Sequence, residues 1–180
     1  VLMALQVLPF ETAMTYLDFN TLGVLLGMML FVSIVKLSGV FEFLAIKCAH
    51  LAKGNPWRIM MLLTILTAVL SAFLDNVTTV LLVGPMTLTL CKLLKVNPAP
   101  FFITEIMASN IGGTATLIGD PPNIMIGSEA GLTFMDFIYY DAPAVVVIMI
   151  VLIALFYVIY GRKMSVGQAE INAVMELVPA

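Results

Sequence analysis

The sequence predicts an all-α, polytopic membrane protein that contains a re-entrant helical hairpin and a broken transmembrane helix. Hydrophobic residues make up 62% of its 180 residues and charged residues only 11%, a balance far outside that of soluble domains. Two polar segments interrupt the apolar runs, FLDNVTTV at 73–80 and SNIGGTATLIGDPPN at 109–123. Open backbone at bilayer depth is tolerated only where it is buried in protein or lines a cavity. The polar segments are therefore the expected site.

Apolar runs and their breaks divide the chain into a membrane region, 1–163, and a polar cytoplasmic linker, 164–180. The amphipathic segment 40–53 is expected to lie in the membrane interface, and 131–143 is expected to be a loop. The expected membrane elements are a span at about 21–37, a hairpin at 57–94, a broken span at 101–130 and a span at 144–160.

The hairpin must return to the face from which it starts, whether its tip stops within the bilayer or crosses it. Each arm holds about 17 residues, barely enough to span at about 1.5 Å per residue. The tip, 74–77, has no glycine, proline or charge cluster suited to an exposed loop. These features favour a re-entrant hairpin over two full spans.

Basic and acidic residues separate cleanly between the two faces of this arrangement. The excess of lysine and arginine in cytoplasmic loops makes the basic face cytoplasmic and the protein a multi-pass protein of the inner or plasma membrane, with 162–180 inside. The opposite face carries Glu11, Asp18, Asp136 and Asp141. The eight basic residues are Lys36, Lys47, Lys53, Arg58, Lys92, Lys95, Arg162 and Lys163.

Composition also limits the partners. The net charge is −3 and no basic patch could neutralise phosphates, which argues against nucleic acid. Cys48 and Cys91 lack the spacing of metal ligands and are expected to be reduced packing residues. No soluble cofactor is implied. The expected partners are the lipid bilayer and a small inorganic ion or solute.

Asp75 is the main candidate for chemistry in the hairpin. A carboxylate inside the membrane is unfavourable by about 3 kcal/mol or more and is a functional candidate by default. Ser71, Asp75 and Thr79 would share one helix face. A helix break near Asn76 would free backbone groups beside the carboxylate and create an oxygen cage for a small cation. By contrast, the hydroxyls at 87 and 89 are expected only to bond to carbonyls of their own helix.

The broken span offers further polar candidates. Glu105 lies one turn before Ser109 and either titrates in a proton pathway or is hydrated near the cytoplasmic interface. Asp120 is expected to cap the restarting helix, with a role in the proton pathway or ion binding as the alternative. Asn110 and Asn123 bracket the expected unwound loop and are candidate ligand donors.

The backbone of the broken span is expected to open around its glycines and prolines. Gly112 and Gly113 weaken a helix, and Pro121–Pro122 remove two backbone donors in succession. Secondary transporters build their sites from such interrupted helices, whose ends and unwound carbonyls face the ligand. The pattern therefore indicates secondary transport.

The segments LDNVTTVLL and SNIGGTATLIGDPPNIMIG, with KGNPWR ahead of them, resemble one branch of the ion transporter superfamily. This branch, with a citrate-transporter-like domain, contains arsenite permeases, NhaD-type sodium–proton antiporters and the melanosomal P protein. The similarity runs from about residue 20 to 163. It implies a two-fold inverted repeat of which this chain resembles the amino-terminal half, so a carboxy-terminal repeat is expected to be missing and the protein is expected to form a homodimer.

The resemblance also implies a set of site residues. The related dicarboxylate-transporting branch has Ser-Asn-Thr at the hairpin tip, which binds sodium and the substrate carboxylate, whereas this tip reads Asp75-Asn76-Val77. An acid there disfavours a carboxylate substrate, because like charges repel strongly at low dielectric. The implied Na⁺ ligands are Ser71, Asp75, Asn76 and Gly112. The wider ion and substrate set adds Ser109, Asn110, Gly113 and Asn123.

The resulting prediction is a non-enzymatic secondary transporter coupled to Na⁺ or H⁺. The expected reaction is efflux of an arsenite-type solute or Na⁺/H⁺ antiport. One alternative is an intramembrane aspartyl protease using Asp75 and Asp120. The sequence 117–120 lacks the first glycine of the GxGD pattern of such proteases. The other alternative is a membrane assembly subunit that transports nothing.

Overall fold

The computed structural model describes residues 19–161, 164 and 166–177, together with Pro9, Thr12 and Leu17. Every regular element in this part of the chain is helical, which confirms the all-α prediction. The elements are α2 (Phe19–Leu37), α3 (Val40–Leu51), α4 (Pro56–Ser71), α5 (Asn76–Leu94), α6 (Ala99–Gly113), α7 (Pro121–Ala130), α8 (Phe134–Phe156), the π-helical turn η1 (Tyr157–Gly161) and α9 (Gln168–Met175).

Several helices are long and apolar enough to cross a bilayer. Among the described residues these are α5 and the continuous unit of α8 and η1. α2 and α3 meet the same criteria as one pair bent by 63°. The chain is thus a polytopic membrane protein, and the re-entrant hairpin, the interfacial place of 40–53 and the sidedness stay predictions. Of the charges on which the sidedness rests, Glu11, Asp18, Arg162 and Lys163 lie outside the described residues.

Local sequence signals explain where the hairpin helices begin and end. Asn55 caps α4 by accepting a hydrogen bond of 3.1 Å from the backbone N–H of Arg58, with Pro56 in the first turn. α4 ends at Ser71, and α5 begins after Asp75, whose side chain accepts from the N–H of Thr78 at 2.8 Å. The predicted break near residue 76 is confirmed.

Helix α8 begins earlier than expected. The segment 131–143, expected as a loop, is helical from Phe134 onward. Thr133 and Asp136 form a reciprocal capping box that starts the helix. Pro143 is accommodated within it. The predicted loop was therefore wrong, because the Thr-x-x-Asp capping signal outweighed the polar composition.

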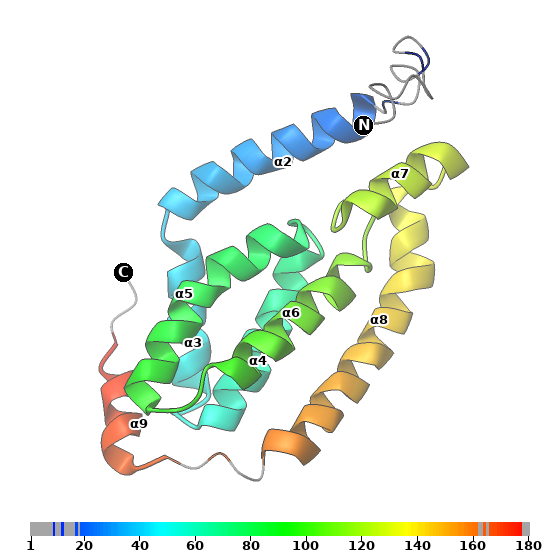
Figure 1. Cartoon of the computed structure of the whole chain (residues 1–180). Coiled ribbons are helices and arrows are strands. Elements are labelled where there is room, and N and C mark those ends of the chain that lie inside the picture. Colours follow the sequence, from blue (N-terminus) through cyan, green and yellow to red (C-terminus); the bar gives the residue numbers. More distant parts are fainter. Residues whose placement is uncertain are drawn as a thin grey trace.

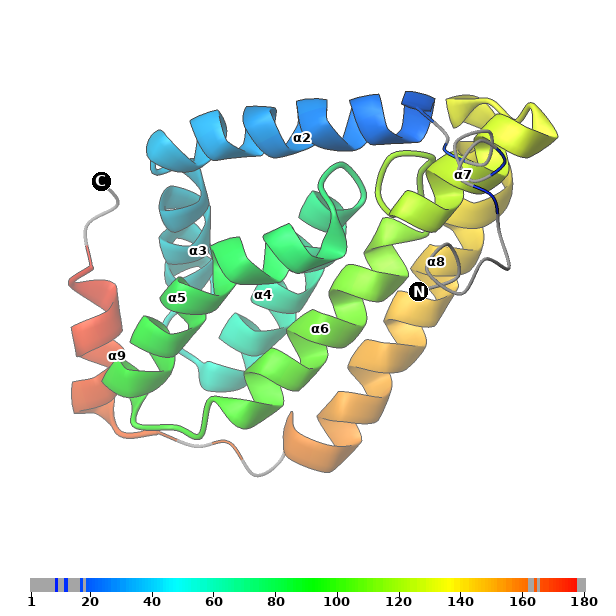
Figure 2. The same cartoon turned by 45° about the horizontal axis from the view of Figure 1, so that its top comes forward.

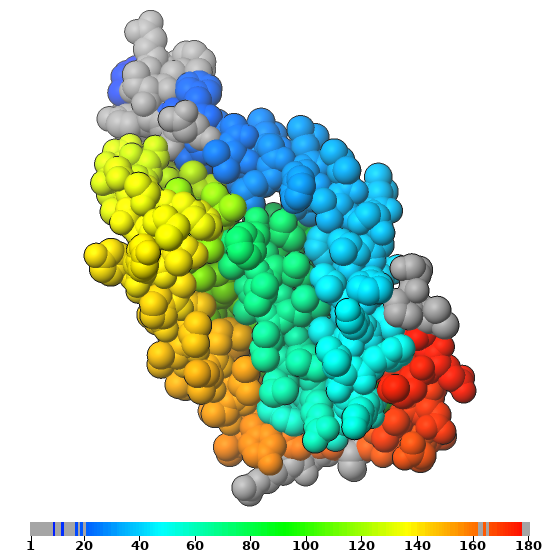
Figure 3. Space-filling model, turned by 180° about the vertical axis from the view of Figure 1, so that it is seen from behind, coloured from blue at the N-terminus to red at the C-terminus, as the bar shows by residue number. Residues whose placement is uncertain are grey.

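Helices α4, α5 and α6 pack side by side, and α8 flanks α6 (Figure 1). On the opposite face of the molecule, α4 lies between α8 and α3 (Figure 3). α2 crosses over the tip end of the hairpin instead of running alongside it (Figure 2). Its Val32 is buried in a small cluster with Leu74 at the tip and Leu82 of α5.

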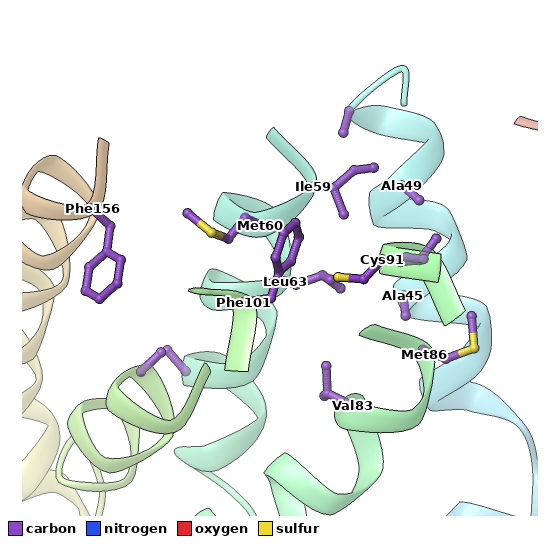
Figure 4. Close-up of a cluster of buried hydrophobic side chains, with 14 of the residues drawn as sticks. Ala45, Ala49, Ile59, Met60, Leu63, Val83, Met86, Cys91, Phe101 and Phe156 are labelled. Carbon is purple, nitrogen blue, oxygen red and sulfur yellow. The ribbon is translucent and has the colours of Figure 1, made fainter. Parts of the chain in front are cut away.

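A larger apolar core joins the hairpin to its neighbours. Phe101 of α6 is fully buried together with Met60 and Leu63 of α4 and Cys91 of α5, and these side chains gather in one cluster (Figure 4). Ala45 and Ala49 of α3 belong to the same core. One face of α3 is thus packed against the hairpin.

The linker contains a docked helix. Val174 of α9 is completely buried, and Ile171 lies so close to Gly54 that a β-carbon there would come within 2.7 Å of its Cγ2. Gly54 also has a φ of +70°, which favours glycine. Lys95, at the end of α5, forms an ion pair of 3.0 Å with Glu170. α9 therefore packs against the base of the hairpin.

Candidate functional site

The two polar segments meet at the tip of the hairpin. The Ser71 hydroxyl donates to the carbonyl oxygen of Ser109 at 2.7 Å, and the side-chain amide of Asn76 donates to Oδ1 of Asn110 at 3.0 Å. The hydroxyl of Thr116 donates to the carbonyl oxygen of Ala72. Side chains about 35 to 45 residues apart in sequence thus form one polar junction.

A cavity of about 290 Å³ opens beside this junction, between α5 and α6. Its polar lining comes from Asn76, Ser109 and Asn110, three of the residues predicted for the site. The remaining lining is apolar: Val77, Val80, Leu81 and Ile106. A small pocket with few convergent polar groups suits a small solute or a partly hydrated ion.

The break between α6 and α7 satisfies part of its own backbone. The Asn123 amide donates to the carbonyl oxygens of Gly113 at 3.2 Å and Thr116 at 2.9 Å. The Thr116 hydroxyl accepts from the N–H of Gly119 at 3.1 Å. Asn123 thus holds the two ends of the break together, and its predicted role as a ligand remains a prediction.

The break lies later in the chain than expected. Gly112 and Gly113 are the last residues of α6, and 121–123 form the first turn of α7, so the unwound residues are 114–120. A β-carbon on Gly112 would come within 2.6 Å of the Ala68 Cα, and one on Gly113 would come within 3.0 Å of the Gly119 carbonyl oxygen. These glycines permit close packing of backbones, which a helix can do without unwinding.

Asp75 lies within electrostatic range of Asp120 at the junction and contributes to its electrostatic environment. Both side chains are half-buried. Asp75 caps α5, whereas Asp120 stands at the cap position of α7 without a side-chain capping bond. The expected cap by the Asp120 side chain is therefore absent. Two neighbouring acids attract a shared cation.

The predicted Na⁺ ligands Ser71, Asn76 and Gly112 each take part in a hydrogen bond in this conformation, and their oxygens keep a lone pair for a cation. The Ser71 hydroxyl donates to the Ser109 carbonyl oxygen, and the Gly112 carbonyl accepts from the N–H of Ala115 at 3.0 Å. The Oδ1 of Asn76 accepts from the N–H of Val77. In the described part of the chain, no three His, Cys, Asp or Glu side chains cluster as a metal site would require. Cation binding would therefore rest on Asp75 and Asp120 with backbone and amide oxygens.

Glu105 lies in the core and not near water. Its side chain is completely buried, and its Oε1 accepts a hydrogen bond of 2.5 Å from the Thr87 hydroxyl. The expectation that Glu105 is hydrated at the interface was wrong. The expectation for Thr87 was wrong as well, whereas Thr89 does bond to the Pro85 carbonyl oxygen of its own helix. A proton pathway through Glu105 or Asp120 stays a prediction.

Two structural participants were missed in the sequence. Thr116 bridges the hairpin and the break, and Thr87 is the partner of Glu105. Thr116 lies within the second polar segment, so its position there was an available signal. The Thr87 contact joins residues 18 apart on two helices, and only the packing of α5 on α6 reveals it.

The family model described as "Citrate transporter" matches residues 1–175. An uncharacterized transporter of Mycobacterium tuberculosis is 55% identical over 139 residues, which are 77% of this chain and 32% of that protein. A 46 kDa membrane protein of Mycobacterium leprae is 45% identical over 168 residues, 93% of this chain and 39% of that protein. The P protein of Homo sapiens is 42% identical over 161 residues, 86% of this chain and 19% of that protein. The chain thus covers well under half the length of these relatives.

Proposed function

The chain belongs to the citrate transporter family of membrane transporters, and from this premise we propose that it forms part of a secondary transporter coupled to Na⁺ or H⁺. The exchange of Na⁺ for H⁺ is the preferred reaction, and efflux of an arsenite-type solute is the second candidate. The human P protein and the mycobacterial transporters are relatives of this chain, and their names specify no cargo.

The observation that carries the proposal is the acidic junction at the hairpin tip. Asp75 lies within electrostatic range of Asp120 where the hairpin and the broken helix meet, and the neighbouring Asn76 lines a mostly apolar cavity together with Asn110. A negative junction attracts Na⁺ or H⁺ and repels a free carboxylate. Competition of the two cations for the same carboxylate is a simple physical basis for antiport, because a bound proton removes the negative charge that holds Na⁺.

The test uses the full-length gene product in proteoliposomes. Radioactive sodium uptake is measured with an imposed pH gradient, and a pH-sensitive dye inside the vesicles reports the opposing proton flux. Sodium uptake that requires the pH gradient and is accompanied by proton movement supports antiport. If neither sodium nor protons move, while arsenite efflux responds to neither gradient, the proposal of ion-coupled transport fails.

The variant Asp75→Asn tests the role of the acid itself. It keeps the shape and one oxygen acceptor but removes the charge, so sodium- and pH-dependent flux should be lost while the protein still inserts. Asp141→Asn is the matched control, because Asp141 is an exposed acid on α8. Unchanged sodium and pH dependence in Asp75→Asn would place the coupling site elsewhere.

The alternative of an intramembrane aspartyl protease that uses Asp75 and Asp120 predicts a different result. Cleavage of a membrane-embedded peptide would have to disappear in both Asp→Ala variants. If the protein is an assembly subunit that transports nothing, vesicles containing the wild type should be indistinguishable from protein-free vesicles in both flux assays. These outcomes separate the alternatives from the transport proposal.

A further inference from the structure

Glu105 differs from the other acids in its surroundings. Its side chain is completely buried, and its Oε2 has no hydrogen-bond partner. Its Oε1 accepts from Thr87 at 2.5 Å. Among the described residues, the one ion pair joins Lys95 to Glu170. Glu105 therefore has no ion pair with a described basic side chain.

The helices that pack against α6 supply few other charges. Cys91 of α5 lies within electrostatic range of Glu105 and is itself buried. The remaining titratable groups on these helices point away from the core: Arg58 of α4 and Lys92 of α5 are exposed, Asp136 of α8 bonds to Thr133, and Tyr139, Tyr140 and Asp141 of α8 are exposed.

An ionised carboxylate in this environment is strongly unfavourable, because it loses water and gains no cation. A neutral carboxylic acid fits the same geometry. In that form Oε1 is the carbonyl oxygen that accepts from Thr87, which leaves Oε2 to carry the proton. We propose that Glu105 is a second ion site, separate from the acidic junction, which binds one proton in this conformation and releases it when the core between α5 and α6 opens to water. This inference rests on the proposed function.

Residues on the cavity side of Glu105 indicate the route by which a proton would reach it. Ser109 lies one turn further along the same face of α6 and lines the cavity. On α5, Thr79, Val83 and Thr87 share a face at a spacing of four residues. The Thr79 hydroxyl is buried without a partner, and Val83 is almost completely buried between the two threonines. Ser109 thus places a polar group at the cavity one helical turn from Glu105, whereas Val83 separates Thr79 from the Thr87–Glu105 pair.

A direct measurement of the proton does not depend on transport. The full-length protein in lipid is titrated across a broad pH range while the infrared C=O band of protonated carboxylic acids is recorded. A band that is present in the wild type and absent from Glu105→Gln identifies the proton on Glu105. Thr87→Val should shift this band, because it removes the donor to Oε1, whereas the control Thr89→Val should not. If wild type and Glu105→Gln have the same protonated-carboxyl spectrum, the inference is overturned.

Transport measurements then separate this site from the acidic junction. Sodium–sodium exchange at equal pH requires no net proton movement, whereas uptake driven by a pH gradient does. Glu105→Gln should retain the exchange and reduce the gradient-driven uptake, because only the acidic junction is then left to carry protons. Retention of gradient-driven uptake with the wild-type pH dependence overturns the inference, and so does loss of both activities in a folded protein. Absence of sodium flux in the wild type is a failure of the proposed function alone, and the infrared titration still decides the protonation of Glu105.

Discussion

The hydroxyl of Ser71 and the carbonyl oxygen of Ser109 lie 2.7 Å apart, and their hydrogen bond joins the end of the first hairpin arm to the broken helix. Both residues are almost completely buried. The bond therefore fixes the position of the tip relative to the cavity lined by Ser109.

Replacing Ser71 by alanine should lower the free energy of unfolding by about 1 kcal/mol, because it removes one buried hydrogen bond. Thermal unfolding of the full-length protein in detergent measures this change. Ser33→Ala is the control, since the Ser33 hydroxyl bonds only to the Met29 carbonyl of its own helix. Equal melting temperatures for the wild type and Ser71→Ala would show that the bond does not stabilise the junction.

The variant Gly112→Ala should be more damaging than its single added methyl group suggests. Its β-carbon would overlap the Ala68 backbone, which cannot rotate away as a side chain can. Overpacking of this kind costs about 1–3 kcal/mol, so the melting temperature and the yield of folded protein should fall. Gly27→Ala is the matched control, because no atom lies within 4 Å of a β-carbon there. A wild-type melting temperature for Gly112→Ala would argue against close backbone contact between α4 and α6.

Cysteine labelling distinguishes a re-entrant tip from a full crossing. Leu74 is only 7% exposed and would label slowly at any depth, whereas Phe73 is 53% exposed and is the better position. We expect Phe73→Cys to react poorly with an impermeant maleimide added from outside. Asp141→Cys, on the exposed start of α8, is the reference for a residue predicted to face outside water. Labelling of both cysteines at equal rates would mean that the hairpin crosses the membrane fully.

Docking of α9 should weaken at acidic pH. The side-chain hydrogen bond from Lys95 holds the pKa of Glu170 below its ordinary value of 4.5. A lowered folded-state pKa stabilises docking above the unfolded value, and this contribution is lost as the pH falls through the folded value. The protection factors of the α9 amides, which correct for the intrinsic slowing of hydrogen exchange in acid, should therefore fall below about pH 4.5.

Variants assign this pH dependence to the ion pair. Glu170→Gln should have lower protection factors in α9 at neutral pH and show no further fall in acid. Glu176→Gln, on the exposed carboxy-terminal side of α9, should behave like the wild type. An identical acid response in Glu170→Gln and the wild type would exclude Glu170 as its source.

The sequence was most informative where its signal was local. Apolar runs interrupted by DN and by GDPP predicted both helix breaks, because caps and prolines act on neighbouring backbone groups. The break after α6 was nevertheless predicted too early, since Gly112 and Gly113 serve contacts with Ala68 and Gly119. Glycine has the same appearance in a sequence whether it permits an unusual backbone conformation or close packing.

Properties that depend on tertiary packing were less accessible. The burial of Glu105 and its bond to Thr87 arise from the packing of α5 against α6, and neither residue signals the other in the sequence. The orientation of α2 across the hairpin tip is likewise a tertiary property (Figure 2). Hydropathy gives the length and polarity of a helix but not its direction.

The hydrogen bonds from Asn123 to the carbonyls of Gly113 and Thr116, and from Gly119 to Thr116, have a consequence for biosynthesis. Unpaired backbone groups hinder the transfer of a nascent chain from the translocon into lipid. This interrupted segment pairs part of its open backbone from within its own 11 residues, Gly113 to Asn123, so these bonds need no later part of the polypeptide to form.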